Sequence, residues 1–100
     1  MAFNELQIQA VWEKASIVQG VNPNEWRKDQ CSAWISRNAY GNRNSNYGWE
    51  IDHITAKANG GSDALSNLRP LHWNNNASRQ DGRLVCVIKS QGNINTRVTS

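Results

Sequence analysis

Two extended segments, separated by a glycine-rich loop and followed by a helical segment, constrain the fold of this chain most strongly. Residues 49–54, Trp-Glu-Ile-Asp-His-Ile, begin with bulky side chains and alternate in part, which is typical of a β-strand. A Gly-Gly pair at 60–61 then turns the chain. Residues 68–71 predict a second short strand, whose proline restricts it to a sheet edge or a strand end. From about Asn74 we expect a helix that Gly82 terminates, and the order strand, loop, strand, helix predicts an α+β fold.

Local signals also predict structure outside this segment. Asn4 and Gln7 have the spacing of a capping box, which indicates an N-terminal helix over about residues 5–15, with Leu6 among its buried residues. Residues 84–88 are apolar and β-branched and indicate a further strand. The polar tail that follows them is expected to fray.

Length and composition set the broad class of protein. The 100 residues are enough for one ordinary hydrophobic core and too few for two, so residues 1–100 are expected to form a single domain. The longest apolar run is far shorter than the roughly 20 residues that a membrane span needs, so no membrane protein is expected. Residues 1–10 contain no Lys or Arg, which predicts no targeting signal and favours a cytoplasmic location. The net charge of +3 favours a polyanionic partner.

The chain has two cysteines, Cys31 and Cys86. They lie far apart in the sequence and match neither a dense disulfide framework nor the closely spaced pairs of a zinc site. We therefore expect no structural zinc bound by thiolates.

The predicted strand, loop, strand and helix also carry the residues with chemical potential. Asp52 and His53 are followed by the Gly-Gly loop, by Asn67 before a leucine, and by Asn76 with Arg79 three residues later. This order resembles the HNH nuclease family, in which a strand bearing Asp-His, an Asn-Leu at the start of a second strand and a His or Asn on the next helix form a ββα-metal site. The third residue is asparagine here, so the signature becomes His-Asn-Asn.

The resemblance is close over residues 49–82, the expected ββα-metal core, and loose over residues 1–48. Many family members also bind zinc through paired CxxC motifs, the second of which would bracket the positions of His72 and Asn75. Only Cys31 corresponds to any of those four ligands. We therefore expect a zinc-free member held by a tryptophan-rich core, in which removal of the catalytic metal abolishes cleavage without unfolding the protein.

The resemblance implies a metal-dependent endonuclease and a role for each signature residue. His53 would be the general base. Asp52 and Asn76 would hold one divalent cation, while Asn67 would brace the loop that presents the histidine. Arg79 would share the metal-facing side of the helix and clamp the scissile phosphate. Products with 5′ phosphate and 3′ hydroxyl ends are implied in the same way.

Elementary chemistry supports these roles. Hydrolysis of a phosphodiester requires an activated water and a cation that neutralises charge on the phosphate oxygens. Imidazole has a pKa of about 6.5 in water, so a histidine such as His53 can accept a proton near neutral pH. Carboxylate and amide oxygens, as in Asp52 and Asn76, suit Mg²⁺ or Mn²⁺. Because adjacent strand residues point to opposite faces, we expect the strand to end here, with metal and base on opposite sides of the phosphorus.

Other polar residues near the signature leave alternatives open. Glu50 either pairs with a basic residue or supports the metal ligands, and His72 either packs structurally or supports the site. Contacts to a nucleic-acid backbone, which give affinity and salt dependence, are predicted for four basic residues, Arg37, Arg43, Arg69 and Arg83.

Three functions remain open at this level. The first is a DNA endonuclease that uses Mg²⁺ or Mn²⁺, nicks one strand and acts as a monomer, with a dimer as the alternative state. The second is a DNA-binding module that has lost turnover, and the third is an RNA-directed nuclease with the same site residues. The resemblance is to small bacterial or phage-like proteins, and sequence specificity and biological role stay undetermined.

Overall fold

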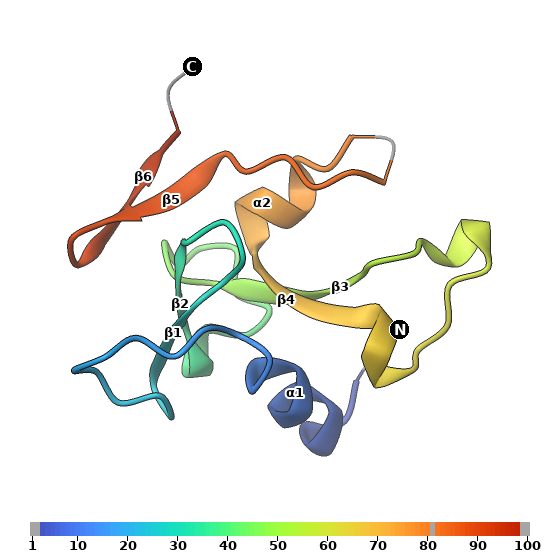
Figure 1. The fold of residues 1–100 in the computed structure, drawn as a ribbon, viewed down its shortest axis with the longest axis horizontal. Coiled ribbons are helices and arrows are strands. Elements are labelled where there is room, and N and C mark those ends of the chain that lie inside the picture. Colours follow the sequence, from blue (N-terminus) through green and yellow to red (C-terminus); the bar gives the residue numbers. More distant parts are fainter. Residues whose placement is uncertain (1–2, 81, 99–100) are drawn as a thin grey trace.

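The computed structural model describes residues 3–80 and 82–98 (Figure 1). Within these residues the strands form antiparallel pairs: β1 (Trp26–Lys28) with β2 (Trp34–Ser36), β3 (Trp49–His53) with β4 (Leu68–His72), and β5 (Ile88–Gln91) with β6 (Ile94–Arg97). The helical elements are α1 (Glu5–Trp12), α2 (Trp73–Ala77) and the short 3-10 helices η1 (Arg37–Ala39), η2 (Lys57–Asn59) and η3 (Leu65–Asn67). The predicted α+β class is confirmed, and no described helix has the length and apolar character to cross a membrane.

The β3–β4 pair and α2 form the predicted order of strand, loop, strand and helix. In the antiparallel register Trp49 pairs with His72 and His53 pairs with Leu68. The loop between the strands carries η2 and η3, and its η2 part extends away from the rest of the molecule (Figure 1). Helix α2 follows β4 directly and ends at Ala77, earlier than the Gly82 end predicted from sequence. Three consecutive asparagines, a residue of low helix propensity, explain the short helix.

Helix α1 begins at the predicted residue, but it buries a different side than the sequence predicted. The Asn4 and Gln7 side chains each accept a hydrogen bond from the other residue's backbone N–H, which completes the capping box. The prediction that Leu6 is buried is wrong, because its side chain is 83% exposed. The helix instead buries the side that carries Trp12, its largest apolar residue, together with Ile8 and Val11.

The hydrophobic core lies between α1 and the β3–β4 pair. Trp12 and Trp49 are fully buried, with their ring centroids 5.3 Å apart, and Tyr40 packs edge-on against Trp49. Burying an aromatic ring of this size removes about 150–250 Å² of surface from water. This cluster therefore fixes one face of the strand that ends in Asp52 and His53.

The C-terminal segment is more ordered than the sequence predicts. The strand expected at 84–88 begins at Ile88 instead, and the polar segment through Arg97 forms the β5–β6 hairpin. The hairpin is held against β2, because Trp34 donates its backbone and indole N–H groups to Asn95 Oδ1 and Gly92 O, each at 2.7 Å. These are contacts between distant segments, which local polarity does not reveal.

A disulfide joins Cys31 to Cys86, across a sequence separation of 55 residues. Their wide spacing did not predict this bond. Disulfides are typical of oxidising compartments and rare in the cytoplasm. The bond connects the turn after β1 to the segment that leads into β5.

The buried carboxylate of Asp29 joins the same regions by hydrogen bonds. Its Oδ1 accepts from the backbone N–H groups of Cys31 and Ala33, at 3.0 and 2.9 Å. Its Oδ2 accepts from the backbone of His72 at 2.9 Å and from the Asn75 amide at 3.1 Å. These five residues, hereafter the Asp29 cluster, fix the position at which β4 passes into α2.

Candidate functional site

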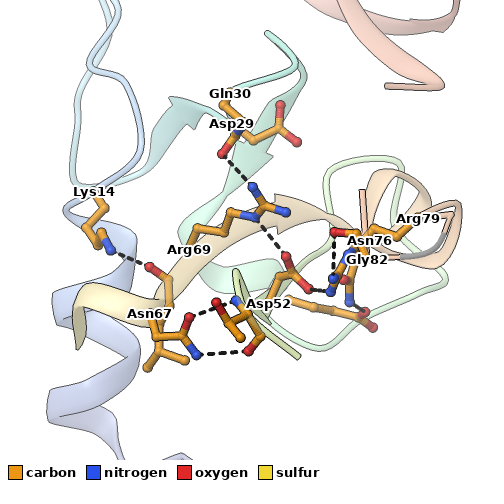
Figure 2. A network of polar contacts seen from close by, with 12 residues as sticks. Lys14, Asp29, Gln30, Asp52, Asn67, Arg69, Asn76, Arg79 and Gly82 are labelled. Carbon is orange, nitrogen blue, oxygen red and sulfur yellow. Dashed lines mark hydrogen bonds and ion pairs between the residues drawn. The ribbon is translucent and has the colours of Figure 1, made fainter. Parts of the chain in front are cut away.

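Asp52 lies next to the end of β3, and its side chain is 3% exposed. Its Oδ2 accepts a hydrogen bond from Arg69 Nε at 2.7 Å, and Oδ1 accepts one from Arg79 Nη1 (Figure 2). Arg69 is its cross-strand partner on β4, whereas Arg79 follows α2. A buried carboxylate is strongly unfavourable without compensation, and the two guanidinium groups provide it.

His53, the next residue, faces a different set of neighbours. Its Nε2 lies 2.7 Å from Asp63 Oδ1, and Lys57 donates to the other oxygen of the same carboxylate at 3.2 Å. The hydrogen bonds from His53 and Lys57 hold the pKa of Asp63 below its ordinary value. Asp63 therefore presents a carboxylate that orients the imidazole, and Nδ1 is left as the ring nitrogen on which a water molecule can be activated.

Asn67 holds the loop between the two strands. Its Oδ1 accepts from the Thr55 backbone N–H at 2.8 Å, and its Nδ2 donates to the carbonyl oxygens of Thr55 and Ser62, at 3.0 and 2.8 Å (Figure 2). The loop is tight here, because a Cβ on Gly61 would lie 1.8 Å from the Thr55 carbonyl oxygen. Asn67 thus connects the residues after His53 to the residue before Asp63, and so sets the geometry of the histidine and its carboxylate.

Asn76 and Glu50 lie side by side between α2 and β3. The Asn76 amide donates to Glu50 Oε1 at 2.9 Å, while Arg43 binds both carboxylate oxygens, at 2.6 and 2.9 Å. Burial acts to raise the pKa of Glu50, but the hydrogen bonds from Arg43 and Asn76 outweigh it and hold the pKa below its ordinary value. Glu50 therefore pairs with a basic residue and orients the Asn76 amide. Because Asn76 donates through Nδ2 to Glu50, its side-chain carbonyl oxygen, Oδ1, is available as a ligand.

His72 has structural contacts on both ring nitrogens. Its Nδ1 accepts from the Asn74 backbone N–H at 3.1 Å, and its Nε2 lies 2.7 Å from the carbonyl oxygen of Asn46. Burial lowers the pKa of His72, which favours the neutral ring that can donate at one nitrogen and accept at the other. These contacts cap α2 and leave neither nitrogen for a metal ion.

The four basic residues predicted to contact nucleic acid lie in different places. Arg69 donates a hydrogen bond to Asp52. The Arg43 guanidinium is held by Glu50 and lies 5.9 Å from the centroid of the Trp73 ring. Arg37 donates to Gln9 and Glu5 of α1, away from the signature residues, and Arg83 is exposed beyond α2. The structure thus brings Arg69 to the signature residues, together with Arg79, and does not bring Arg37 there.

Arginines hold both Asp52 oxygens, so Asp52 would have to exchange one of these contacts to hold a divalent cation. A buried carboxylate, with the Asn76 carbonyl available as a second oxygen ligand, is the kind of site that Mg²⁺ or Mn²⁺ occupies. The two guanidinium groups at Asp52 together carry the charge of one such ion. Among the described residues, no group of three His, Cys, Asp or Glu side chains could hold a metal ion. Water and phosphate oxygens would therefore complete the coordination.

The region thus combines a ββα unit with a buried aspartate, an acid-paired histidine and an asparagine-braced loop. In the comparison with family models, residues 39–82 match the HNH endonuclease family. This segment belongs to that family, whose members are nucleic-acid hydrolases, and the resemblance inferred from sequence is confirmed. Comparisons with curated proteins and with solved structures found no match.

Two residues of this region escaped the sequence analysis. Asp63 had a usable signal, since it is the one acidic residue between His53 and Asn67, in the loop that the asparagine was expected to brace. Asp29 had none, because a single acid beside a cysteine and several polar residues is typical of an exposed turn. Its burial becomes evident only when β1, β4 and α2 meet.

Proposed function

We propose that this protein is a metal-dependent endonuclease that hydrolyses phosphodiester bonds of DNA and nicks one strand. In this proposal residues 1–100 form one nuclease unit that acts as a monomer. The observation that carries it is the arrangement at the end of β3. Asp52 and His53 are adjacent, and each is held by its own charged partners: two arginines for the aspartate, one carboxylate for the histidine.

His53 is proposed as the general base. The Asp63 carboxylate accepts the Nε2–H, so Nδ1 has the lone pair that removes a proton from the attacking water. The same carboxylate stabilises the imidazolium that forms and fixes the ring orientation. Asn67 is proposed as a positioning residue, because its hydrogen bonds hold the loop that carries Asp63.

Asp52 and Asn76 are the proposed ligands of Mg²⁺ or Mn²⁺. When bound, the ion supplies positive charge at the phosphate and at the departing 3′ oxygen. Arg79 donates to Asp52 Oδ1 and to the Gly82 carbonyl oxygen. Once the carboxylate has another counter-charge, the guanidinium can donate to a phosphate oxygen instead, for which its planar N–H groups are well suited.

A second candidate is a nucleic-acid-binding module with this fold and without turnover. The two ion pairs at Asp52 favour it, because they already satisfy the carboxylate that the cation requires. The two candidates differ in whether a divalent ion displaces an arginine.

The test is conversion of supercoiled plasmid to nicked circles by the purified chain in Mg²⁺, Mn²⁺ or EDTA. We expect metal-dependent nicking that His53→Ala and Asn76→Ala abolish and Asp63→Asn slows by about tenfold or more. Asn74→Ala is the matched control for Asn76→Ala, because both residues lie in α2, and it should retain activity. Circular dichroism checks the folding of each variant.

Other outcomes would contradict the proposal in distinct ways. Wild type and folded variants that are equally inert but shift DNA on a gel would establish the binding module. Nicking that survives His53→Ala undiminished would overturn the assignment of the base. Faster cleavage of RNA than of DNA of the same sequence would change the substrate and leave the site residues in place.

A further inference from the structure

A hollow of about 200 Å³ adjoins the Arg69 side of the proposed active site. It lies where the segment after α1 meets β1 and β4. Its lining combines three apolar residues, Ala15, Ile54 and Pro70, with five residues that have hydrogen-bonding side chains, namely Lys14, Ser16, Lys28, Gln30 and Arg69. The proposed mechanism gives Lys14, Lys28 and Gln30 no role.

The charge of this hollow is strongly positive for its size. Three of its lining residues are cationic, Lys14, Lys28 and Arg69, and no acidic residue lines it among the described part of the chain. Like charges around one hollow repel each other, and an anion bound between them would relieve the repulsion. The nearest carboxylate partner in the hydrogen-bond network is Asp52, which Arg69 shares with Arg79.

Backbone contacts fix the segments that carry the two lysines. Ser16 and Lys28 exchange backbone hydrogen bonds, at 2.8 and 3.0 Å, which joins the segment after α1 to β1. The Lys14 ammonium donates to the carbonyl oxygens of Leu65 and Leu68 (Figure 2). An ammonium has three N–H donors, so these two contacts leave one for a ligand. Lys28 Nζ lies 4.7 Å from the centroid of the Trp34 ring, which is outside the lining of the hollow, so the ammonium would exchange this cation–π contact for an anion there.

Arg69 connects the hollow to the proposed active site. Its Nε binds Asp52 at 2.7 Å, and its Nη1 lies 3.5 Å from Gln30 Oε1 (Figure 2). Since a guanidinium has five N–H donors in a plane, it can contact Asp52 and an anion in the hollow at once. An anion bound there would lie one side chain away from the carboxylate that is proposed to hold the metal.

We propose that this hollow binds a backbone phosphate of the substrate strand, adjacent to the phosphate that is cut. The inference rests on the proposed function and deepens it, because it adds Lys14, Lys28 and Gln30 to the substrate-binding surface. Ile54, which is 44% exposed, offers an apolar contact to the sugar beside that phosphate. Recognition of this kind fixes the position of the strand and carries no base specificity.

The test is DNA binding in EDTA, which does not depend on cleavage. Fluorescence anisotropy of a fluorescein-labelled duplex of about 20 base pairs gives Kd over a series of KCl concentrations. Lys28→Gln is expected to raise Kd by about threefold to tenfold and to lower the slope of log Kd against log salt by about 0.9, the loss of one phosphate contact. Lys28→Arg should restore both values. Lys89→Gln removes the same charge from exposed β5 and should leave the slope unchanged.

Equal effects of Lys28→Gln and Lys89→Gln on Kd and slope would overturn the proposal, since they would show only the loss of net charge. Gln30→Glu is a second variant, on an exposed side chain, in case Lys28→Gln fails to fold. It places a negative charge in the hollow and should weaken binding more than Lys28→Gln does. Normal nicking without a slope difference would contradict this inference alone, whereas a slope difference without nicking would contradict only the proposed function.

Discussion

Asp29 and Asp52 are two aspartates of almost equal burial, 2% and 3% exposed, with opposite kinds of partner. Asp29 accepts three backbone N–H groups and one side-chain amide. Asp52 accepts two arginine side chains. Backbone donors cannot leave without unfolding the segments that carry them, whereas an arginine can turn toward another anion. Burial alone therefore does not distinguish a structural carboxylate from one that can change partners, but the type of donor does.

The same difference separates the regions around the two carboxylates. Asn75 extends the Asp29 cluster by accepting the backbone N–H groups of Val87 and Ile88 at 2.8 and 2.9 Å and donating to the Ile88 carbonyl. Each of these Asn75 bonds joins α2 to the segment that leads into β5. Around Asp52 the contacts are between charged side chains, and the adjacent hollow is open to a ligand. One region thus holds the fold while the other can exchange its counter-charges.

The largest expected effect is on stability at the Asp29 cluster. Asp29→Ala leaves four buried donors without an acceptor and should lower the free energy of unfolding by about 3–5 kcal/mol. Asp52→Ala should lower it less, because the two groups it leaves are arginine side chains, 14% and 17% exposed, that can move toward solvent without unfolding the backbone. Urea unfolding followed by tryptophan fluorescence measures both. Equal losses in the two variants would break the distinction between fixed and exchangeable partners.

The disulfide also tests the difference between the Asp29 cluster and the region around Asp52, with a smaller expected loss of stability. Cys86→Ser is expected to lower the free energy of unfolding by about 2–4 kcal/mol, because the bond closes a long loop and constrains the unfolded chain. Cleavage at 25 °C should persist, since the bond joins the Asp29 cluster to the β5 segment and does not contact Asp52. The melting temperature with and without a reducing agent measures the effect.

Cys86→Ser itself is the control, because a reducing agent should not shift its melting temperature further. Loss of cleavage in the folded variant would show that the disulfide also positions the active site. An unchanged melting temperature of the reduced wild type would show that the bond adds nothing to the Asp29 cluster.

Local sequence patterns predicted the parts of this molecule that depend on local physics. The capping box at Asn4, the β3 and β4 strands and the order of signature residues all follow from short-range spacing. The exposure of Leu6 and the β5–β6 hairpin were predicted incorrectly, because tertiary contacts decide them, and the end of α2 was predicted incorrectly because the low helix propensity of its three asparagines was not considered. The Cys31–Cys86 bond, the burial of Asp29 and the pairing of Asp63 with His53 depend on which distant segments meet, and single-residue patterns carry no such information.

The smallest expected effect is a pH dependence that originates at His72, whose backbone N–H is part of the Asp29 cluster. Burial lowers the pKa of this ring, although the carboxylates of Asp29 and Glu50 act in the opposite direction. The unfolded chain, with an ordinary histidine pKa of about 6.5, then binds a proton that the folded protein does not. Stability should therefore fall as the pH drops below that value, by about 1 kcal/mol between pH 7.5 and 5.5.

His72→Asn tests this origin, because asparagine also caps a helix and does not titrate in this range. The free energy of unfolding of the variant should change less between the two pH values than that of the wild type. The same pH dependence in the variant would show that the Asp29 cluster does not couple folding to protons through His72.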